Sequence, residues 1–134
     1  MKILVTGASG LIGSALVPAL EAQGHTVVRA VRRTPTSTSE VAWDPAAGTI
    51  ASGALEGVDA VIHLAGAGIG DKRWTDSYKR EILESRTRST ALLAEAMASA
   101  TVAPRVFLSG SAQSGSPRPM RRMRGDGRLR RLRR

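Results

Sequence analysis

The feature that most constrains this chain is a short apolar segment that runs directly into three glycines spaced three residues apart. Residues 3–5 are Ile, Leu and Val, which suits a strand buried on both faces, and from Leu11 onward the apolar residues recur at helical spacing. A strand, a glycine-rich turn and a helix in direct succession are typical of a nucleotide phosphate site. The three glycines are Gly7, Gly10 and Gly13.

Each glycine has its own expected role in such a turn. The missing Cβ permits the tight turn at Gly7, lets a pyrophosphate approach the main chain at Gly10, and lets the helix pack against the sheet at Gly13. The helix N-terminus adds free N–H groups and a partial positive charge. The alternative is a structural turn without a ligand. The position of the glycine motif between a strand and a helix favours phosphate binding. A P-loop is excluded because no Gly-Lys-Ser/Thr follows.

The remaining pattern predicts an α/β fold, a Rossmann-like doubly wound parallel sheet. Helical spacing extends to residue 20, and a second strand at residues 26–31 requires a right-handed parallel crossover. Residues 41–50 suggest a short hairpin or an irregular excursion, because Pro45 bars a central strand. The later predicted elements are a strand at 58–64, a helix at 75–100 and a strand at 105–109.

The net charge of +9 is concentrated at one end of the chain. Residues 118–134 contain nine arginines and one acid, whereas the other residues together carry a net charge of only +1. We therefore expect a folded domain at residues 1–112 and an arginine-rich, disordered tail at residues 113–134.

Composition also excludes several classes of site. The chain has no cysteine, so it has neither disulfides nor thiolate metal sites. His25 and His63 are too few and too far apart in sequence to indicate a metal, and both are expected to be structural. No apolar run reaches the roughly 18 residues that a membrane-spanning helix needs. We expect a cytoplasmic protein without a membrane span.

Four sequence blocks carry a resemblance to a known family. They are Val5-Thr-Gly7-Ala-Ser-Gly10-Leu-Ile-Gly13, Trp43-Asp44-Pro45, Asp59-Ala-Val-Ile-His-Leu-Ala-Gly66, and Arg73-Trp74-Thr-Asp-Ser-Tyr-Lys79 followed by Glu84-Ser85-Arg86 and Thr90. The chain resembles the N-terminal part of an extended or atypical short-chain dehydrogenase/reductase, in the NAD(P)-dependent epimerase/dehydratase family and its YfcH-like subfamily. The resemblance covers residues 1 to about 112, and it implies that residues 1–112 are the N-terminal portion of an NAD(P)-binding Rossmann domain. The Trp-Asp-Pro and Arg-Trp-Thr blocks are its most selective parts.

The resemblance implies a dinucleotide coenzyme site. The residues that it places at the coenzyme are Gly7, Ala8, Ser9, Gly10, Leu11, Ile12 and Gly13 at the pyrophosphate, and Leu64, Ala65 and Gly66 on the adenosine side. At the end of the second strand, where an NAD-selective site places an acid, the chain has Arg32 and Arg33. A guanidinium there suits a 2′-phosphate, so NADP is favoured over NAD, with Arg32 as its contact. The alternative is two solvated arginines.

The resemblance implies little catalytic machinery in this chain. Ser111 aligns with the hydroxyl that positions the substrate oxygen in such enzymes. The Tyr-x-x-x-Lys pair is absent, because the only tyrosine, Tyr78, is followed at the fourth position by Ile82. Tyr78 and Trp74 are expected to lie in the core. Only the resemblance draws attention to two further helix residues, Ser85 and Arg86.

After residue 112 the composition changes abruptly, where relatives continue into a substrate-binding half. We therefore expect a truncated or frame-shifted chain that keeps the coenzyme-binding half and is catalytically inactive. Two alternatives remain. One is a non-catalytic NADP-binding module, and the other is non-specific nucleic-acid binding through the basic tail, since no aromatic residue interleaves its arginines.

Overall fold

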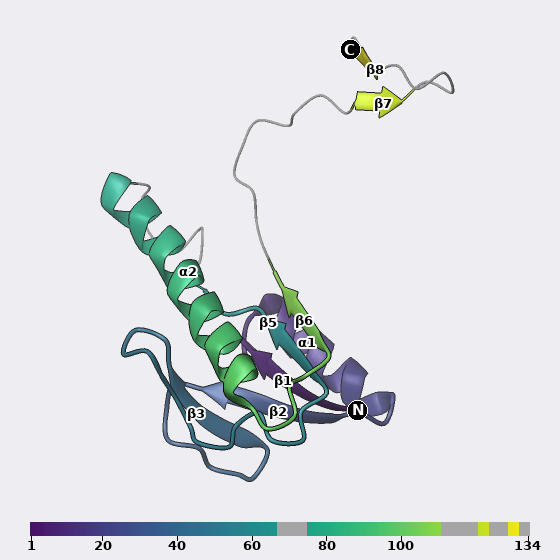
Figure 1. Cartoon of the computed structure of the whole chain (residues 1–134), viewed down its shortest axis with the longest axis vertical. Coiled ribbons are helices and arrows are strands. Elements are labelled where there is room, and N and C mark those ends of the chain that lie inside the picture. The colour runs from purple at the N-terminus through teal and green to yellow at the C-terminus, as the bar shows by residue number, and fades with distance from the viewer. Residues whose placement is uncertain (67–74, 111–120, 124–128, 132–134) are drawn as a thin grey trace.

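The described part of the chain contains a six-stranded sheet and two helices (Figure 1). The computed structural model describes residues 1–66, 75–110, 121–123 and 129–131. In chain order the elements are β1 (Lys2–Thr6), α1 (Leu11–Ala22), β2 (Thr26–Val31), β3 (Glu40–Asp44), β4 (Thr49–Ile50), β5 (Ala60–His63), α2 (Asp76–Ser99), β6 (Val106–Ser109), β7 (Arg121–Met123) and β8 (Leu129–Arg131). The strand order in the large sheet is β4-β3-β2-β1-β5-β6.

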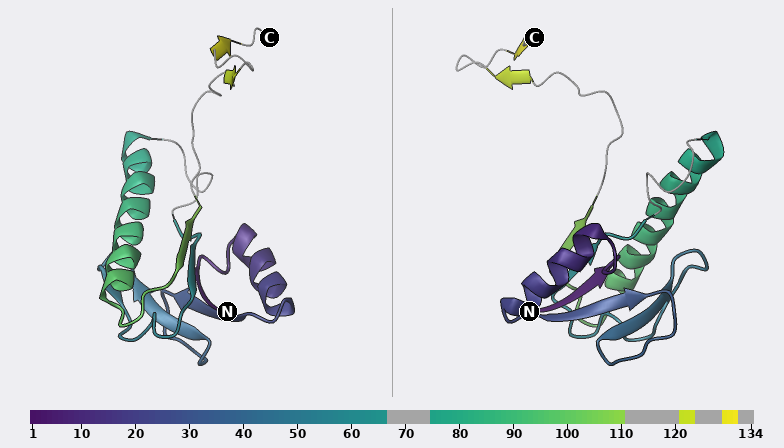
Figure 2. Two further views of the ribbon diagram at one scale, coloured as in Figure 1. Left: turned by 45° about the vertical axis from the view of Figure 1, so that its right-hand side comes forward. Right: turned by 180° about the vertical axis from the view of Figure 1, so that it is seen from behind.

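Five strands of this sheet run parallel, which confirms the predicted doubly wound topology. β1 lies in the middle: α1 connects it to β2 on one side, and α2 connects β5 to β6 on the other. The two helices cover opposite faces of the sheet, as Figure 2 shows. The chain therefore has a Rossmann-like α/β fold.

The residues between β2 and β5 form the hairpin that the sequence left open as one alternative. β3 pairs in parallel with β2 and antiparallel with β4, where Trp43 lies opposite Ile50. Asp44 accepts hydrogen bonds from the backbone amides of the two turn residues after Pro45, at 3.1 and 3.2 Å. Pro45 itself lies just beyond β3, so it removes no donor from the sheet.

The central strand buries apolar side chains on both faces. Leu4 packs into a cluster that Leu93 of α2 closes, whereas Ile3 and Val5 pack into a second cluster that Val17 of α1 closes. Leu93 is 0% exposed and Val17 is 2% exposed. The continuous apolar run at the start of the sequence is therefore the signature of a strand covered on both sides.

Beyond these two clusters the packing is thinner. At the β6 edge, Val106 and Leu108 are 41% and 56% exposed, while Phe107 packs against the cluster beneath α2. Within the described ranges, no helix has both the length and the apolar character needed to cross a membrane.

The boundary predicted at residue 112 falls in 111–120, outside the described residues. β7 and β8 pair with each other as a separate antiparallel ladder. The division into a domain and a tail stays a prediction.

Candidate functional site

The candidate site lies where the parallel strands end at their carboxyl side. Ligands of open α/β sheets bind at this edge, where successive connections leave in opposite directions. In this chain that point lies between β1 and β5, because α1 and α2 pack on opposite faces (Figure 2). The turn after β1, the loop after β5 and the ends of β2 and β6 therefore define the site.

The turn after β1 approaches the loop after β5 so closely that residue 7 has to be glycine. Gly7 has φ +69°, a backbone conformation that favours glycine. A Cβ on Gly7 would lie 2.7 Å from the backbone nitrogen of Ala65 and 2.8 Å from the carbonyl carbon of Leu64. The turn is closed by a hydrogen bond from the amide of Gly10 to the carbonyl of Gly7, at 3.1 Å.

The other two glycines of the motif have different surroundings. A Cβ on Gly13 would lie 2.3 Å from the carbonyl oxygen of Gly7 and 2.7 Å from the Cα of Ala8. The sequence predicts that Gly13 permits helix-to-sheet packing, and the structure shows that its close contact is with the turn itself. A Cβ on Gly10 would meet only the Gly7 oxygen, at 3.3 Å. Position 10 is therefore the one with space for a ligand.

Within the described residues, the N-terminus of α1 has backbone amides without a hydrogen-bond acceptor. Gly10 is the N-cap, no side chain caps the helix, and its first turn contains no acidic residue. The amide of Ser14 makes the first backbone bond back to Gly10, at 2.9 Å, so the three amides before it lack an intrahelical acceptor. Leu11 and Ile12 beside these amides are 91% and 65% exposed. An open helix N-terminus of this kind attracts an anion.

The two arginines after β2 differ in their contacts. Arg33 forms a two-pronged ion pair with Glu40, with N–O distances of 2.8 and 2.6 Å. This pair, together with the backbone amide of Thr36, lowers the pKa of Glu40 to about 2. Arg32 is exposed, and within the described ranges it has no acid partner. The sequence predicts Arg32 as the contact of a 2′-phosphate; this stays a prediction, and of the two arginines only Arg33 has an acid partner within the described ranges.

A buried histidine connects the strand ends to α2. His63, the last residue of β5, is 2% exposed. Its ring lies between two hydroxyls, with Thr6 Oγ1 2.6 Å from Nδ1 and Ser89 Oγ 2.9 Å from Nε2. Thr6 and His63 are register partners in β1 and β5, and Ser89 comes from the middle of α2. Three elements are therefore joined through one side chain.

The partners of the two hydroxyls determine which ring nitrogen carries the hydrogen. Thr6 Oγ1 accepts the amides of Leu64 and Ala65 at 3.1 and 3.2 Å, so its own hydrogen is donated to Nδ1. Ser89 Oγ is 2.6 Å from the carbonyl of Ser85 and donates to it, so Nε2 is the donor to Ser89. The ring is therefore neutral, with its hydrogen on Nε2.

The surroundings of His63 disfavour its charged form. Burial lowers its pKa, and the nearby positive charge of Arg86 lowers this pKa further. Trp43 contacts the ring edge-on, with centroids 6.0 Å apart, and Phe107 stacks on it at 6.4 Å. The sequence predicts a structural histidine, and the geometry fits a fixed hydrogen-bonding link between strands and helix.

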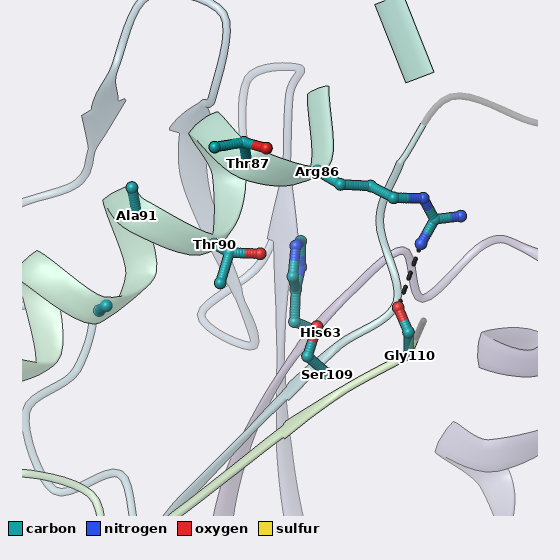
Figure 3. Close-up of a pocket in the computed structure, with 8 residues that line it drawn as sticks. His63, Arg86, Thr87, Thr90, Ala91, Ser109 and Gly110 are labelled. Atoms are coloured by element: carbon teal, nitrogen blue, oxygen red, sulfur yellow. Dashed lines mark hydrogen bonds between the residues drawn. The ribbon is translucent and has the colours of Figure 1, made fainter. Parts of the chain in front are cut away.

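A groove of about 470 Å³ opens beside this histidine, between α2 and the end of β6 (Figure 3). The Nη1 atom of Arg86 donates a hydrogen bond across it to the carbonyl of Gly110, at 3.1 Å. Residue spacing alone predicts no role for Arg86. The residues that line the groove are His63, Arg86, Thr87, Thr90, Ala91, Ala94, Ser109 and Gly110.

Some of the remaining predicted residues lie in the described part of the chain, and others lie outside it. Leu64 and Ala65 lie half-buried after β5 with their amides on Thr6, and Gly66 is exposed beside them. Tyr78 is buried in the core, as expected. Ser111 and Trp74 lie outside the described residues, so the catalytic role of Ser111 stays a prediction. Among the described residues, no three His, Cys, Asp or Glu side chains could hold a metal ion.

The parallel sheet and the glycine turn after β1 define a Rossmann-like domain. The family model of the NAD dependent epimerase/dehydratase family matches residues 3–131, and the chain belongs to that family. It is 42% identical over 110 residues to the Epimerase family protein ML0860 of Mycobacterium leprae, covering 82% of this chain and 35% of the relative. The chain thus spans about a third of the length of the curated relatives that it matches.

Solved structures show the same fold. The human epimerase family protein SDR39U1 (isoform 2), crystallised with NADPH, is 34% identical with a TM-score of 0.65, and the match covers 81% of this chain and 36% of the human one. MoeE5 in complex with UDP-glucose and NAD is 26% identical with a TM-score of 0.61, and the match covers 90% of this chain and 40% of MoeE5.

Proposed function

We propose that this chain binds the coenzyme NADP at the glycine turn, as the coenzyme-binding part of an epimerase/dehydratase-like oxidoreductase. The observation that carries the proposal is the uncapped N-terminus of α1, whose free amides lie beside the one motif glycine with open space, Gly10. These amides would hold the pyrophosphate. The exposed Leu11 and Ile12 would pack against the bound coenzyme, which explains two large apolar side chains at the surface.

The preference for NADP over NAD rests on Arg32. It is exposed at the carboxyl end of β2 and has no acid partner among the described residues, whereas its neighbour Arg33 is held by Glu40. A free guanidinium there can bind the 2′-phosphate that distinguishes NADP. The human relative crystallised with NADPH supports this preference, and MoeE5, which binds NAD, makes NAD the alternative.

Fluorescence titration of the 134-residue chain with NADPH and with NADH tests the proposal. A charge-assisted hydrogen bond contributes about 1.5–3 kcal/mol, so we expect NADPH to bind at least about tenfold tighter. Arg32→Gln should remove this difference, whereas Arg105→Gln, a control at the opposite edge of the sheet, should keep it. Titrations at about 0.3 M salt suppress non-specific attraction by the tail arginines. Equal affinities in the unaltered chain would refute the NADP preference, and no binding of either coenzyme would refute the site.

We also propose that this chain alone does not turn over substrate. Its sequence has no Tyr-x-x-x-Lys pair, so Ser111 would be the one hydroxyl from the expected catalytic set. The UDP-glucose in MoeE5 makes a sugar nucleotide the first substrate to test. The expected result is coenzyme binding without a change in coenzyme absorbance, and turnover that is lost in Ser111→Ala would contradict it.

A second candidate function concerns the basic tail. Nine arginines within residues 118–134 favour non-specific attraction to nucleic acid. Binding to a DNA or RNA oligonucleotide should then weaken steeply as salt rises, and a chain that ends at residue 112 should lose it. Retention that does not depend on salt would contradict this function.

A further inference from the structure

The groove between α2 and β6 contains a cation, Arg86, that no acid among the described residues neutralises. Figure 3 shows the side chain of Arg86 reaching from the helix toward the end of β6, where it donates to Gly110. A Cβ placed on Gly66 would lie 3.5 Å from Cγ and Cζ of Arg86, so the same side chain also passes close to the loop after β5. Arg86 thus lies against the ends of two neighbouring strands.

Within the described residues, the Arg86 side chain uses one of its hydrogen-bond donors. A guanidinium has five N–H groups, and a backbone carbonyl accepts one of them. Within the described ranges, no carboxylate lies within ion-pair distance of Arg86. Three other arginines are paired: Arg29 with Glu21, Arg33 with Glu40, and Arg88 with Glu84. Arg86 is therefore a half-buried cation with donors available to the groove.

The rest of the groove suits a small anionic group. Thr90 is half-buried, and its hydroxyl points toward His63 in Figure 3. The neighbouring Thr87 already donates its hydroxyl to the carbonyl of Leu83 at 2.9 Å, so Thr90 is the helix hydroxyl available to a ligand. The groove, about 470 Å³ in volume, has room for a phosphate or carboxylate group.

We propose that Arg86, assisted by Thr90, binds a phosphate or carboxylate group in the groove between α2 and β6. This subsite is built from α2 and β6, whereas the phosphate site of the proposed function is built from β1 and α1. An experiment can therefore refute one of the two sites without refuting the other. The anion can belong to the coenzyme or to a second ligand, and the experiment distinguishes these sources.

The test is a titration of the full chain with inorganic phosphate, followed by the amide NMR signals of Gly66 and Gly110. Ionic strength is held constant with chloride, so that attraction to the tail does not change. We expect saturable shifts of both signals. Arg86→Gln should weaken the apparent affinity at least tenfold, whereas Arg88→Gln, two residues further along the same helix, should leave it unchanged. Arg86→Lys, which keeps the charge, should retain part of the affinity.

A second titration, with NADPH present at saturation, identifies the source of the anion. Phosphate shifts that persist assign the subsite to a second ligand, and shifts that disappear assign it to a phosphate of the coenzyme. Shifts that stay linear, or that are equal in the unaltered chain and in Arg86→Gln, overturn the proposal. If the unaltered chain binds phosphate but does not bind NADPH, only the coenzyme site is refuted.

Discussion

Replacing Gly13 by alanine should destabilise the protein, although such a change inside a helix normally stabilises. A Cβ at this position would lie 2.3 Å from the carbonyl oxygen of Gly7 and 2.7 Å from the Cα of Ala8, and both are backbone atoms that cannot rotate away. The better helix propensity of alanine contributes about 1 kcal/mol. Forcing atoms into packed structure costs about 1–3 kcal/mol, and three backbone atoms within 2.8 Å of the added Cβ place this change at or above the upper end. We expect a net loss of about 2 kcal/mol.

Urea unfolding followed by circular dichroism measures this loss. With a slope of about 1–3 kcal/mol per molar urea, the midpoint should fall by about 1 M. Gly10→Ala is the matched control, since its Cβ would meet a single atom at 3.3 Å. We expect it to change the midpoint little but to weaken NADPH binding, because it fills the space beside the free amides. A midpoint of Gly13→Ala equal to or above that of the unaltered chain would refute the reasoning.

Three further results follow from the contacts around the site. Because the pKa of His63 is lowered in the folded state, stability should fall as pH drops below about 6.5, by at most about 1.4 kcal/mol per pH unit, and His63→Asn should flatten this dependence in urea unfolding. Thr6→Val should cost about 2–4 kcal/mol by leaving two amides and the ring unpaired, whereas Thr6→Ser should cost much less. Glu40, with a pKa of about 2, should lose its ion pair only in strong acid, so Glu40→Gln should change unfolding at pH 7 and much less at pH 2.

Local patterns in the sequence were sufficient to predict most of the fold. The second strand was predicted at residues 26–31, where β2 lies, and the long helix at 75–100, where α2 spans Asp76–Ser99. The strand predicted at 58–64 is shorter, at Ala60–His63. These predictions succeed because hydrophobic spacing is a property of neighbouring residues, whereas the ends depend on tertiary contacts.

The polar link at His63 was missed because its parts are far apart in the sequence. Thr6 and His63 are separated by 57 residues, and Ser89 lies 26 residues beyond His63. The register that pairs Thr6 with His63 was the available signal, since each is a polar residue ending an apolar strand. The contact of Gly13 with the turn was missed for the same reason, because a glycine spacing says nothing about which backbone approaches it.

The same link explains why the turn and the groove form one edge of the molecule. Thr6 precedes the glycine turn and accepts the amides of Leu64 and Ala65, which fixes the distance between the turn and the loop after β5. Gly7 allows that distance to be short. The hydrogen bond between His63 and Ser89 then links these strands to α2. Ser89 lies three residues after Arg86, about one helical turn further along α2. The Thr6 and Ser89 hydroxyls and both ring nitrogens of His63 each have a hydrogen-bond partner. A movement of α2 relative to the glycine turn would therefore have to break a buried hydrogen bond.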